Sequence, residues 1–310
     1  MNFSVVLIDR EKLELHGNLH AALSHLLEEI QKDHVTVVDI SRTEVAGQLK
    51  MLGADFRDCL VIADCEETVR QAMEWDAAVI GYAPDGILSH VDMIVEGFEE
   101  VDIRFLERAY QRFHHIPWII LETERCIVRE MTIADVDALY ELYQPPKMTR
   151  YQEKLPEDRD EGRAQIQAYE NMYHFYGYGM WAVVEKCAGR LIGRAGLEHL
   201  EMNCLGEANE QTVVRKPGCL NVASEQTIVP ELGYLIAADK QNQGYATEVC
   251  RAILDYAREE LGFSAIYCRV HKENIASLRV AEKLKDVTIL TQSEAAQNRE
   301  VHGTQNLPCQ

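Results

Sequence analysis

Short apolar runs alternate with amphipathic stretches from Phe3 to about Thr123. The runs are continuously apolar, and the stretches between them repeat apolar positions every three or four residues. Strands of this kind, separated by helices, are typical of a parallel sheet covered on both faces. The expected strands cover 5–8, 35–40, 60–63, 77–82 and 93–96, and the expected helices 19–30, 45–52, 69–75 and 103–113. We therefore predict a doubly wound α/β domain.

This first pattern ends around Pro117. A proline disfavours helical backbone in the residue before it, so the preceding helix should stop there. Residues 119–121 are apolar and are expected to form one last strand of the same domain. A chain of 310 residues suits two domains. We place the boundary near 122–124, with domains at 1–122 and 123–310.

A different pattern begins at Arg125. Its first half predicts strands at 126–129, 181–184 and 191–197, and helices at 135–142 and 162–175. The stretch 198–226 is polar and aperiodic. We expect a long loop there, and loops of that length tend to be functional or mobile.

The charge of the chain limits the classes of partner that it could bind. There are 31 Lys and Arg against 51 Asp and Glu, which gives a formal net charge of −20. Such a surface disfavours nucleic acid and favours a cationic or amine-bearing partner. An acidic surface that only keeps the protein soluble explains the charge equally well.

The cysteines and the N-terminus indicate the compartment. Nine cysteines are scattered along the chain, without the Cys-x-x-Cys or Cys/His spacing of a metal site. The N-terminus lacks the features of a signal peptide, and no later stretch is apolar enough to cross a bilayer. We expect a soluble cytoplasmic protein with reduced thiols, no membrane contact and no metal, and an oligomer is possible.

One stretch, 231–248, carries a chemical signal. An apolar strand ends at Ile236, a polar turn follows, and a helical pattern begins just after Gly244. The first amides of a helix lack internal partners and lie at the positive end of its dipole, so they suit a pyrophosphate. Gly244 would let phosphate oxygens approach the backbone, and Ala246 stays small beside them. An ordinary strand–turn–helix corner would have the same pattern.

The spacing Gln241-x-x-Gly244-x-Ala246 resembles the acetyl-CoA signature of GNAT acetyltransferases. It lies between a strand and a long helix, and the strand that follows leads into Asn274-x-x-Ser277. The resemblance covers about 125–284. It implies an α+β domain with the mixed sheet of that family. It also implies an N-acetyltransferase that transfers acetyl from acetyl-CoA to the amine of a small molecule or peptide.

The resemblance also implies which residues bind the cofactor. The pantetheine arm would lie along the backbone of β-strand residues, and the pyrophosphate on the turn and the first helical amides. Asn274 and Ser277 would lie near the thiol, although Asn274 is also a good helix N-cap, and both roles are compatible. The expected pantetheine residues are Tyr234, Leu235 and Ile236, and the expected pyrophosphate residues are Asn242, Gln243, Gly244, Tyr245, Ala246 and Thr247.

Amine acetylation needs a neutral amine, a polarised carbonyl and a proton for the leaving thiolate. By resemblance, Glu231 would take the amine proton, although an exposed strand carboxylate is nearly as good an interpretation. Backbone amides near Leu235 would polarise the carbonyl. The usual tyrosine acid is replaced by Ala281, so Ser277, Tyr267 or water would act instead.

The end of the chain departs from the family. Only 287–290 looks able to form a strand, where two closing strands are usual, so the acceptor side of the sheet would be incomplete, completed by another subunit, or disordered. This departure and Ala281 motivate an alternative function, an acyl-CoA-binding regulatory protein without turnover. The acceptor pocket would be built from 144–161 and 198–226. Tyrosines that either line it or pack on the sheet are Tyr151, Tyr169, Tyr173, Tyr176 and Tyr178.

The first domain resembles a degenerate haloacid-dehalogenase-like fold. The strand at 60–63 is followed by Asp64, where that family places a residue that helps to hold Mg²⁺. The family's Asp-x-Asp nucleophile motif is missing, because Asp9 is followed by Arg10 and Glu11. We expect a noncatalytic domain. A metal cluster of Asp9, Glu11 and Asp64, with a metal-dependent phosphatase activity, is the remaining alternative.

Overall fold

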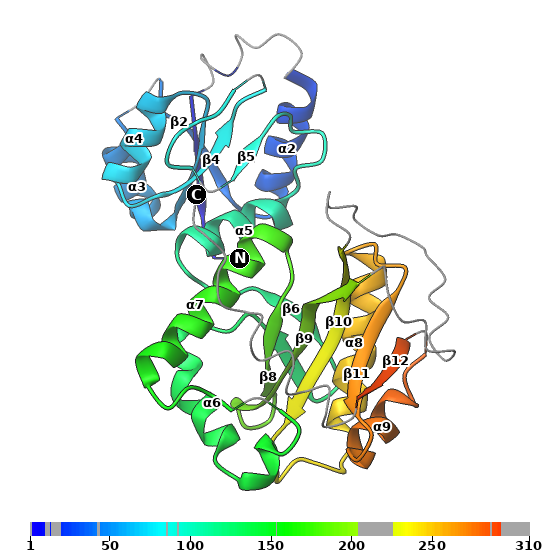
Figure 1. The fold of residues 1–310 in the computed structure, drawn as a ribbon. Helices are drawn as coiled ribbons and strands as arrows, with labels where there is room; N and C mark the ends of the chain where they lie inside the picture. Colours follow the sequence, from blue (N-terminus) through cyan, green and yellow to red (C-terminus); the bar gives the residue numbers. More distant parts are fainter. Residues whose placement is uncertain are drawn as a thin grey trace. The chain divides into compact units, whose positions relative to one another are not determined.

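The fold is described from a computed structural model, which divides into two compact units, 1–118 and 119–310. Each unit is treated by itself (Figure 1). The described residues are 2–9, 13, 20–41, 44–84, 86–91, 93–152, 154–203, 226–285 and 287–292.

The first unit is built on a five-stranded sheet in the order β2-β1-β3-β4-β5, and all its strand pairs are parallel. The strands are β1 (Val5–Ile8), β2 (Thr36–Asp39), β3 (Cys59–Ala63), β4 (Ala78–Tyr82) and β5 (Ile94–Val95). The helices are α2 (His20–Lys32), α3 (Val45–Leu52), α4 (Glu66–Glu74) and α5 (Ile103–Phe113). Every strand and helix expected before residue 114 is confirmed.

The sheet of the first unit buries both faces. Along β1, Val6 and Ile8 belong to one hydrophobic cluster with residues of α2 and α5. Val5 and Leu7 belong to a second cluster with residues of α3 and α4. Because alternate residues of a strand point to opposite faces, the two clusters lie on opposite sides of the sheet. The continuous apolar runs are explained by this double burial.

The second unit contains a seven-stranded mixed sheet in the order β12-β11-β10-β9-β8-β7-β6. Its strands are β6 (Ile119–Glu122), β7 (Cys126–Arg129), β8 (Met180–Glu185), β9 (Arg190–Asn203), β10 (Gln226–Ile236), β11 (Ile266–His271) and β12 (Val287–Gln292). Its helices are α6 (Val136–Tyr143), α7 (Arg159–Tyr176), α8 (Tyr245–Glu259) and α9 (Ile275–Ala281).

Two expectations about this unit were wrong. Residues 119–121 belong to β6, which pairs with β7 in the second sheet and not with the first. Residues 198–203 were expected in a loop but form the end of β9, where each pairs with a residue of β10. The sequence did not predict this strand because it is rich in polar residues, which an antiparallel strand tolerates since only one of its faces needs to be buried. The rest of the expected loop, 204–225, lies outside the described residues.

The helices cover opposite faces of the second sheet. Arg194 on β9 donates a hydrogen bond to Tyr169 of α7. Trp181 on β8 pairs with the next β9 residue, Ala195, and packs edge-to-face on Tyr256 of α8, with 5.8 Å between ring centroids. Neighbouring residues of a strand point to opposite faces, so α7 and α8 lie on opposite sides.

Strands β10 and β11 are parallel neighbours that separate along their length (Figure 1). In the described parts of both strands, their register pair is Glu231 with Tyr267. Beyond it, β10 continues to Ile236 paired with β9, and β11 continues to His271 paired with β12. A gap therefore opens between the two strands on the carboxyl side of Glu231.

The edge of the sheet is closed by β12, which runs parallel to β11 and extends the expected strand by two residues, to Gln292. Residues 293–310 lie outside the described part of the chain. Within the described residues, no helix combines the length and the apolar character needed to cross a membrane.

Candidate cofactor and acyl-transfer site

The backbone beside the gap offers hydrogen-bonding groups. The Ala237 amide donates to the Ile192 carbonyl at 2.7 Å, which fixes the alternation along β9 and β10. Backbone groups of alternate residues face opposite neighbours, so those of Leu235 face β9 and those of Tyr234 and Ile236 point toward the gap. An extended ligand that entered the gap would meet the edge of β10 as an added strand would.

The turn between β10 and α8 has the backbone conformation of an anion site. Asn242 and Gly244 both have positive φ, of 59° and 87°. Alternation of right- and left-handed residues gathers successive amides on one side of a chain, which forms an anion-binding concavity. Gly244 is the N-cap of α8, and no side chain caps the helix there. The turn and the positive end of the helix dipole therefore face the same place.

Gln241 of the signature points back toward the sheet. Its side-chain amide donates to the Ile236 carbonyl at 3.0 Å and to the sulfur of Met148 at 3.3 Å. The first contact covers the last carbonyl of β10, and the second reaches the connection between α6 and α7. Gln241 thus sets where the turn leaves the strand.

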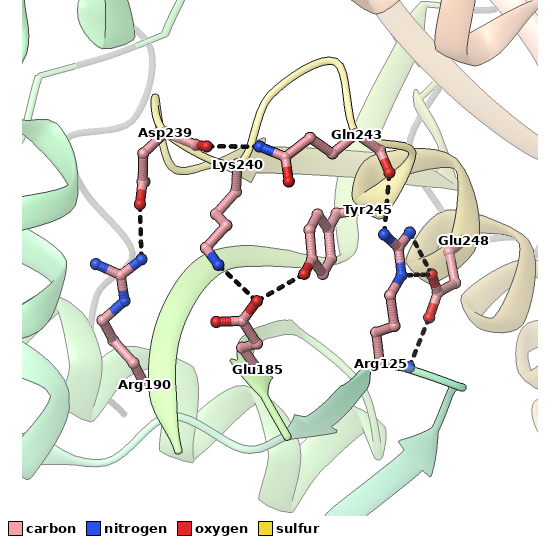
Figure 2. A network of polar contacts seen from close by, with 8 residues as sticks. All are labelled: Arg125, Glu185, Arg190, Asp239, Lys240, Gln243, Tyr245 and Glu248. Carbon is pink, nitrogen blue, oxygen red and sulfur yellow. Dashed lines mark hydrogen bonds and ion pairs between the residues drawn. The ribbon is translucent and has the colours of Figure 1, made fainter. Parts of the chain in front are cut away.

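Arg125 holds the far side of the turn (Figure 2). Its guanidinium donates to the Gln243 carbonyl at 3.0 Å and pairs with Glu248, in the first turn of α8, at 2.6 Å. It also lies 4.0 Å from the ring centroid of Tyr245. A Cβ built on Gly244 would be 3.4 Å from this guanidinium. Glu248, the acidic group nearest the helix N-terminus, is thereby neutralised.

Glu185 holds the turn from below (Figure 2). Its Oε1 accepts from Lys240 and from the Tyr245 hydroxyl, each at 2.6 Å. These two hydrogen bonds lower the pKa of Glu185 despite its burial. Arg190 adds an exposed ion pair with Asp239 at 2.7 Å. The β8–β9 hairpin therefore fixes the turn at three positions.

Glu231 lies where the strands begin to separate. The Arg269 amide, on the side of β11 that faces β10, donates to Glu231 Oε1 at 3.3 Å rather than to a backbone carbonyl of β10. The Arg269 side chain contacts both carboxylate oxygens at 2.8 Å. Glu231 as a whole residue is 8% exposed. Glu231 is thus a buried, paired group and not the exposed strand carboxylate of the alternative interpretation.

Asn274 and Ser277 lie at the start of α9. The Asn274 side chain caps this helix by accepting from the Ser277 amide at 3.2 Å, which confirms the N-cap interpretation. The Tyr234 hydroxyl donates to the Ser277 carbonyl at 3.0 Å. The start of α9 is therefore fixed to β10 across the gap, and β11 leads directly into it.

A family model for the acetyltransferase (GNAT) domain matches residues 125–285, just over half of the chain. The chain belongs to the GNAT acetyltransferase family. The match begins at Arg125 and ends just past α9, so it contains the gap, the turn and both helices beside them. No part of the first unit falls within it.

The proteins to which this GNAT chain is similar share about a quarter of their aligned residues with it. YkkB of Bacillus subtilis is 27% identical over 165 residues, which cover 53% of this chain and 83% of YkkB. The N-acetyltransferase YoaA of the same organism is 26% identical over 167 residues, 53% of this chain and 81% of YoaA. Among solved structures, an acetyltransferase from Agrobacterium tumefaciens has a TM-score of 0.40 at 24% identity, covering 53% of this chain and 81% of its own.

Sequence reasoning missed the residues that hold this site together. Arg125, Glu185 and Arg269 belong to none of the expected motifs. Glu185 follows a predicted strand and precedes a turn, a place where carboxylates are usually solvated. Only the pairing of β8 with β9, and the turn above them, make it a buried acceptor.

The first unit brings Asp9 and Asp64 to the carboxyl ends of the adjacent strands β1 and β3. Glu11, the third member of the expected cluster, lies outside the described residues. Within the described part of the chain, no group of three or more His, Cys, Asp or Glu is placed to hold a metal ion.

Proposed function

We propose that the second unit binds acetyl-CoA and transfers its acetyl group to an amine. The observation that carries this proposal is the combination of a gap between β10 and β11 with a left-handed turn at the N-terminus of α8. The gap suits the extended pantetheine arm, with the backbone of Tyr234 and Ile236 toward it. The end of the turn and the first residues of α8, from Asn242 to Thr247, suit the pyrophosphate.

Transfer forms a bond between the amine nitrogen and the acetyl carbon and breaks the bond from that carbon to sulfur. The amine loses a proton, and the thiolate gains one. The backbone amides at the end of β10 would polarise the carbonyl oxygen, and holding both reactants in place would supply much of the rate. The acid is still open among Ser277, Tyr267 and water.

The role of Glu231 as proton acceptor stays a prediction. Its ion pair with Arg269 holds it in a fixed position, but both its oxygens are already in contact with the guanidinium. We infer that Glu231 has a positioning role as well, because it accepts the first β11 amide past the point of separation. Direct proton transfer would require one oxygen to be shared with the amine or a water molecule.

The test is a calorimetric titration with acetyl-CoA, followed by an assay of acetyl transfer to a broad panel of amines. Binding and at least one acetylated product are expected. Binding without any product would favour the regulatory alternative, and absence of binding would overturn the proposal.

The resemblance of the first unit to haloacid-dehalogenase-like domains, and with it a phosphatase activity, stays a prediction. The all-parallel order β2-β1-β3-β4-β5 is compatible with such a fold. Mg²⁺-dependent phosphate release from a set of phosphate esters would be needed to assign an activity there.

A further inference from the structure

Arg194 is a largely enclosed cation on the face of the sheet opposite α8. It pairs with Leu235 at the end of β10, beside the proposed position of the thioester. One guanidinium nitrogen donates to the Tyr169 hydroxyl at 2.8 Å, and the group lies 5.5 Å from the Tyr143 ring centroid. Its Nε is buried and has no hydrogen-bond partner among the described residues.

The neighbours of Arg194 are phenols rather than a counter-ion. Among the residues that the structure describes, no carboxylate forms an ion pair with it, and Glu198 acts on it only through charge at longer range. Removing a guanidinium from water is costly unless an anion is paired with it. A retained cation of this kind indicates a partner that the chain itself does not supply.

His271 is a second donor of the same kind. The residue is 5% exposed at the end of β11, and its Nδ1 accepts from the Glu273 amide at 3.2 Å. The proton of the neutral ring must then be on Nε2. Nε2 is buried without a partner among the described residues. The ring of Tyr151, from the α6–α7 connection, stacks on it at 5.0 Å between centroids.

The strand registers place these two donors on either side of the gap. Arg194 pairs with Leu235, four residues beyond Glu231, and His271 is four residues beyond Tyr267, the partner of Glu231. All five strand positions share one face, because paired residues and residues two apart along a strand point the same way. This is the face of α6 and α7, away from the helix whose N-terminus would hold the cofactor.

We propose that the acceptor amine carries an oxyanion, a carboxylate or a phosphate, which Arg194 and His271 bind on the α6–α7 face of the gap. This inference rests on the proposed function. Both groups are donors, so a second, protonated amine on the acceptor, which has no lone pair to accept with, would leave them unsatisfied, whereas an oxyanion accepts from both. A carboxylate and a phosphate share this chemistry, and matched substrates distinguish them.

The experiment compares amines that differ only in the anion, at saturating acetyl-CoA. One arm pairs amino acids with their amides, and the other pairs O-phosphoethanolamine with ethanolamine. The wild type is expected to prefer the anionic member of one pair by about 10- to 100-fold in kcat/KM. Equal values for both members of both pairs, or no turnover of any anionic member by protein that binds acetyl-CoA, would overturn the inference.

Variants separate anion binding from packing. Arg194→Met is expected to abolish the preference, Arg194→Lys to keep part of it, and His271→Gln, which retains a donor, to weaken it less than His271→Ala. Each variant should bind acetyl-CoA as the wild type does, which shows that it is folded. A preference that survives in Arg194→Met would refute the assignment. Loss of acetyl-CoA binding in the wild type would instead refute the proposed function.

Discussion

Helices α4 and α8 each follow a strand of their sheet, yet of the two only α8 has the features of an anion site. Cys65, the N-cap of α4, makes no side-chain cap, and Glu66 and Glu67 occupy its first turn. Glu66 accepts from the Ser89 amide at 2.8 Å. These carboxylates already lie at the positive end of the α4 dipole, where a bound anion would be repelled.

At α8 the N-terminus is free of unpaired carboxylates among the described residues. The helix begins at a left-handed Gly244, and its first-turn acid, Glu248, is paired with Arg125. The turn before it is fixed from below by Glu185. The comparison teaches that two helices with similar sequence context differ in what their N-termini offer an anion: at α8 the nearby carboxylate is neutralised and the turn is held in place, and at α4 two carboxylates occupy the first turn.

The sharpest test of this comparison replaces a glycine in each unit. Gly244→Glu is expected to weaken acetyl-CoA binding by about 100-fold or more, because it places a carboxylate and a strained residue beside the pyrophosphate. Gly53→Glu is the control: Gly53 also has positive φ, of 70°, and no atom within 4 Å of a built Cβ. Calorimetry should show normal affinity for the control. Equal affinity in Gly244→Glu would remove the cofactor assignment.

The second effect concerns the chemical step. Glu231→Gln keeps the shape of the side chain but removes the proton acceptor and the ion pair with Arg269. If Glu231 takes the amine proton, kcat falls by about 100-fold or more while acetyl-CoA affinity is retained. Steady-state kinetics and calorimetry separate the two. An unchanged kcat would leave Glu231 with the positioning role alone.

A smaller effect is expected below the turn. Glu185→Gln loses the charge that holds Lys240 and weakens the contact with Tyr245, so the KM for acetyl-CoA should rise about 3- to 10-fold with kcat unchanged. Arg190→Met, which removes only the exposed pair with Asp239, should change KM less than about twofold. Equal effects of the two variants would contradict the idea that the buried contacts order the turn.

The same carboxylate predicts a dependence on pH. Lys240 and Tyr245 hold the pKa of Glu185 below its ordinary value. A group whose pKa is lower in the folded state adds stability above its unfolded pKa and loses it as pH falls through the folded pKa. The difference in unfolding free energy between wild type and Glu185→Gln should therefore shrink on acidification. A difference that stays constant from neutral to acid pH would argue against this coupling.

The smallest effect is expected in the first unit. Asp64→Asn should leave acetyl transfer unchanged, because Asp64 lies in a unit that the GNAT match does not include. The same protein is assayed for Mg²⁺-dependent phosphate release. Release that the wild type shows and Asp64→Asn lacks would give the first unit a catalytic role of its own.

Much of the fold could be predicted because the pattern of apolar residues and the residues typical of turns indicate the same helices and strands. The elements of the first unit could be predicted from its continuous apolar runs, because strands that are buried on both faces are apolar at every position. The end of β9 did not follow, because most of its residues are polar, and in sequence such a strand resembles a loop. For 119–121 the strand was predicted but the sheet was wrong, since an apolar segment does not specify its partner.

The sequence by itself determined the turn before α8, because Gly244 and the residues around it act through their own backbone conformation and through the helix that follows them. Only the tertiary structure decided which groups hold this turn in place. Arg125 directly precedes β7, and Glu185 and Arg269 lie on β8 and β11. They are far in sequence from Glu248, Lys240 and Glu231 and meet them because of the order and register of the strands. Pairing of charges across a sheet depends on that register, and no local pattern of residues records it.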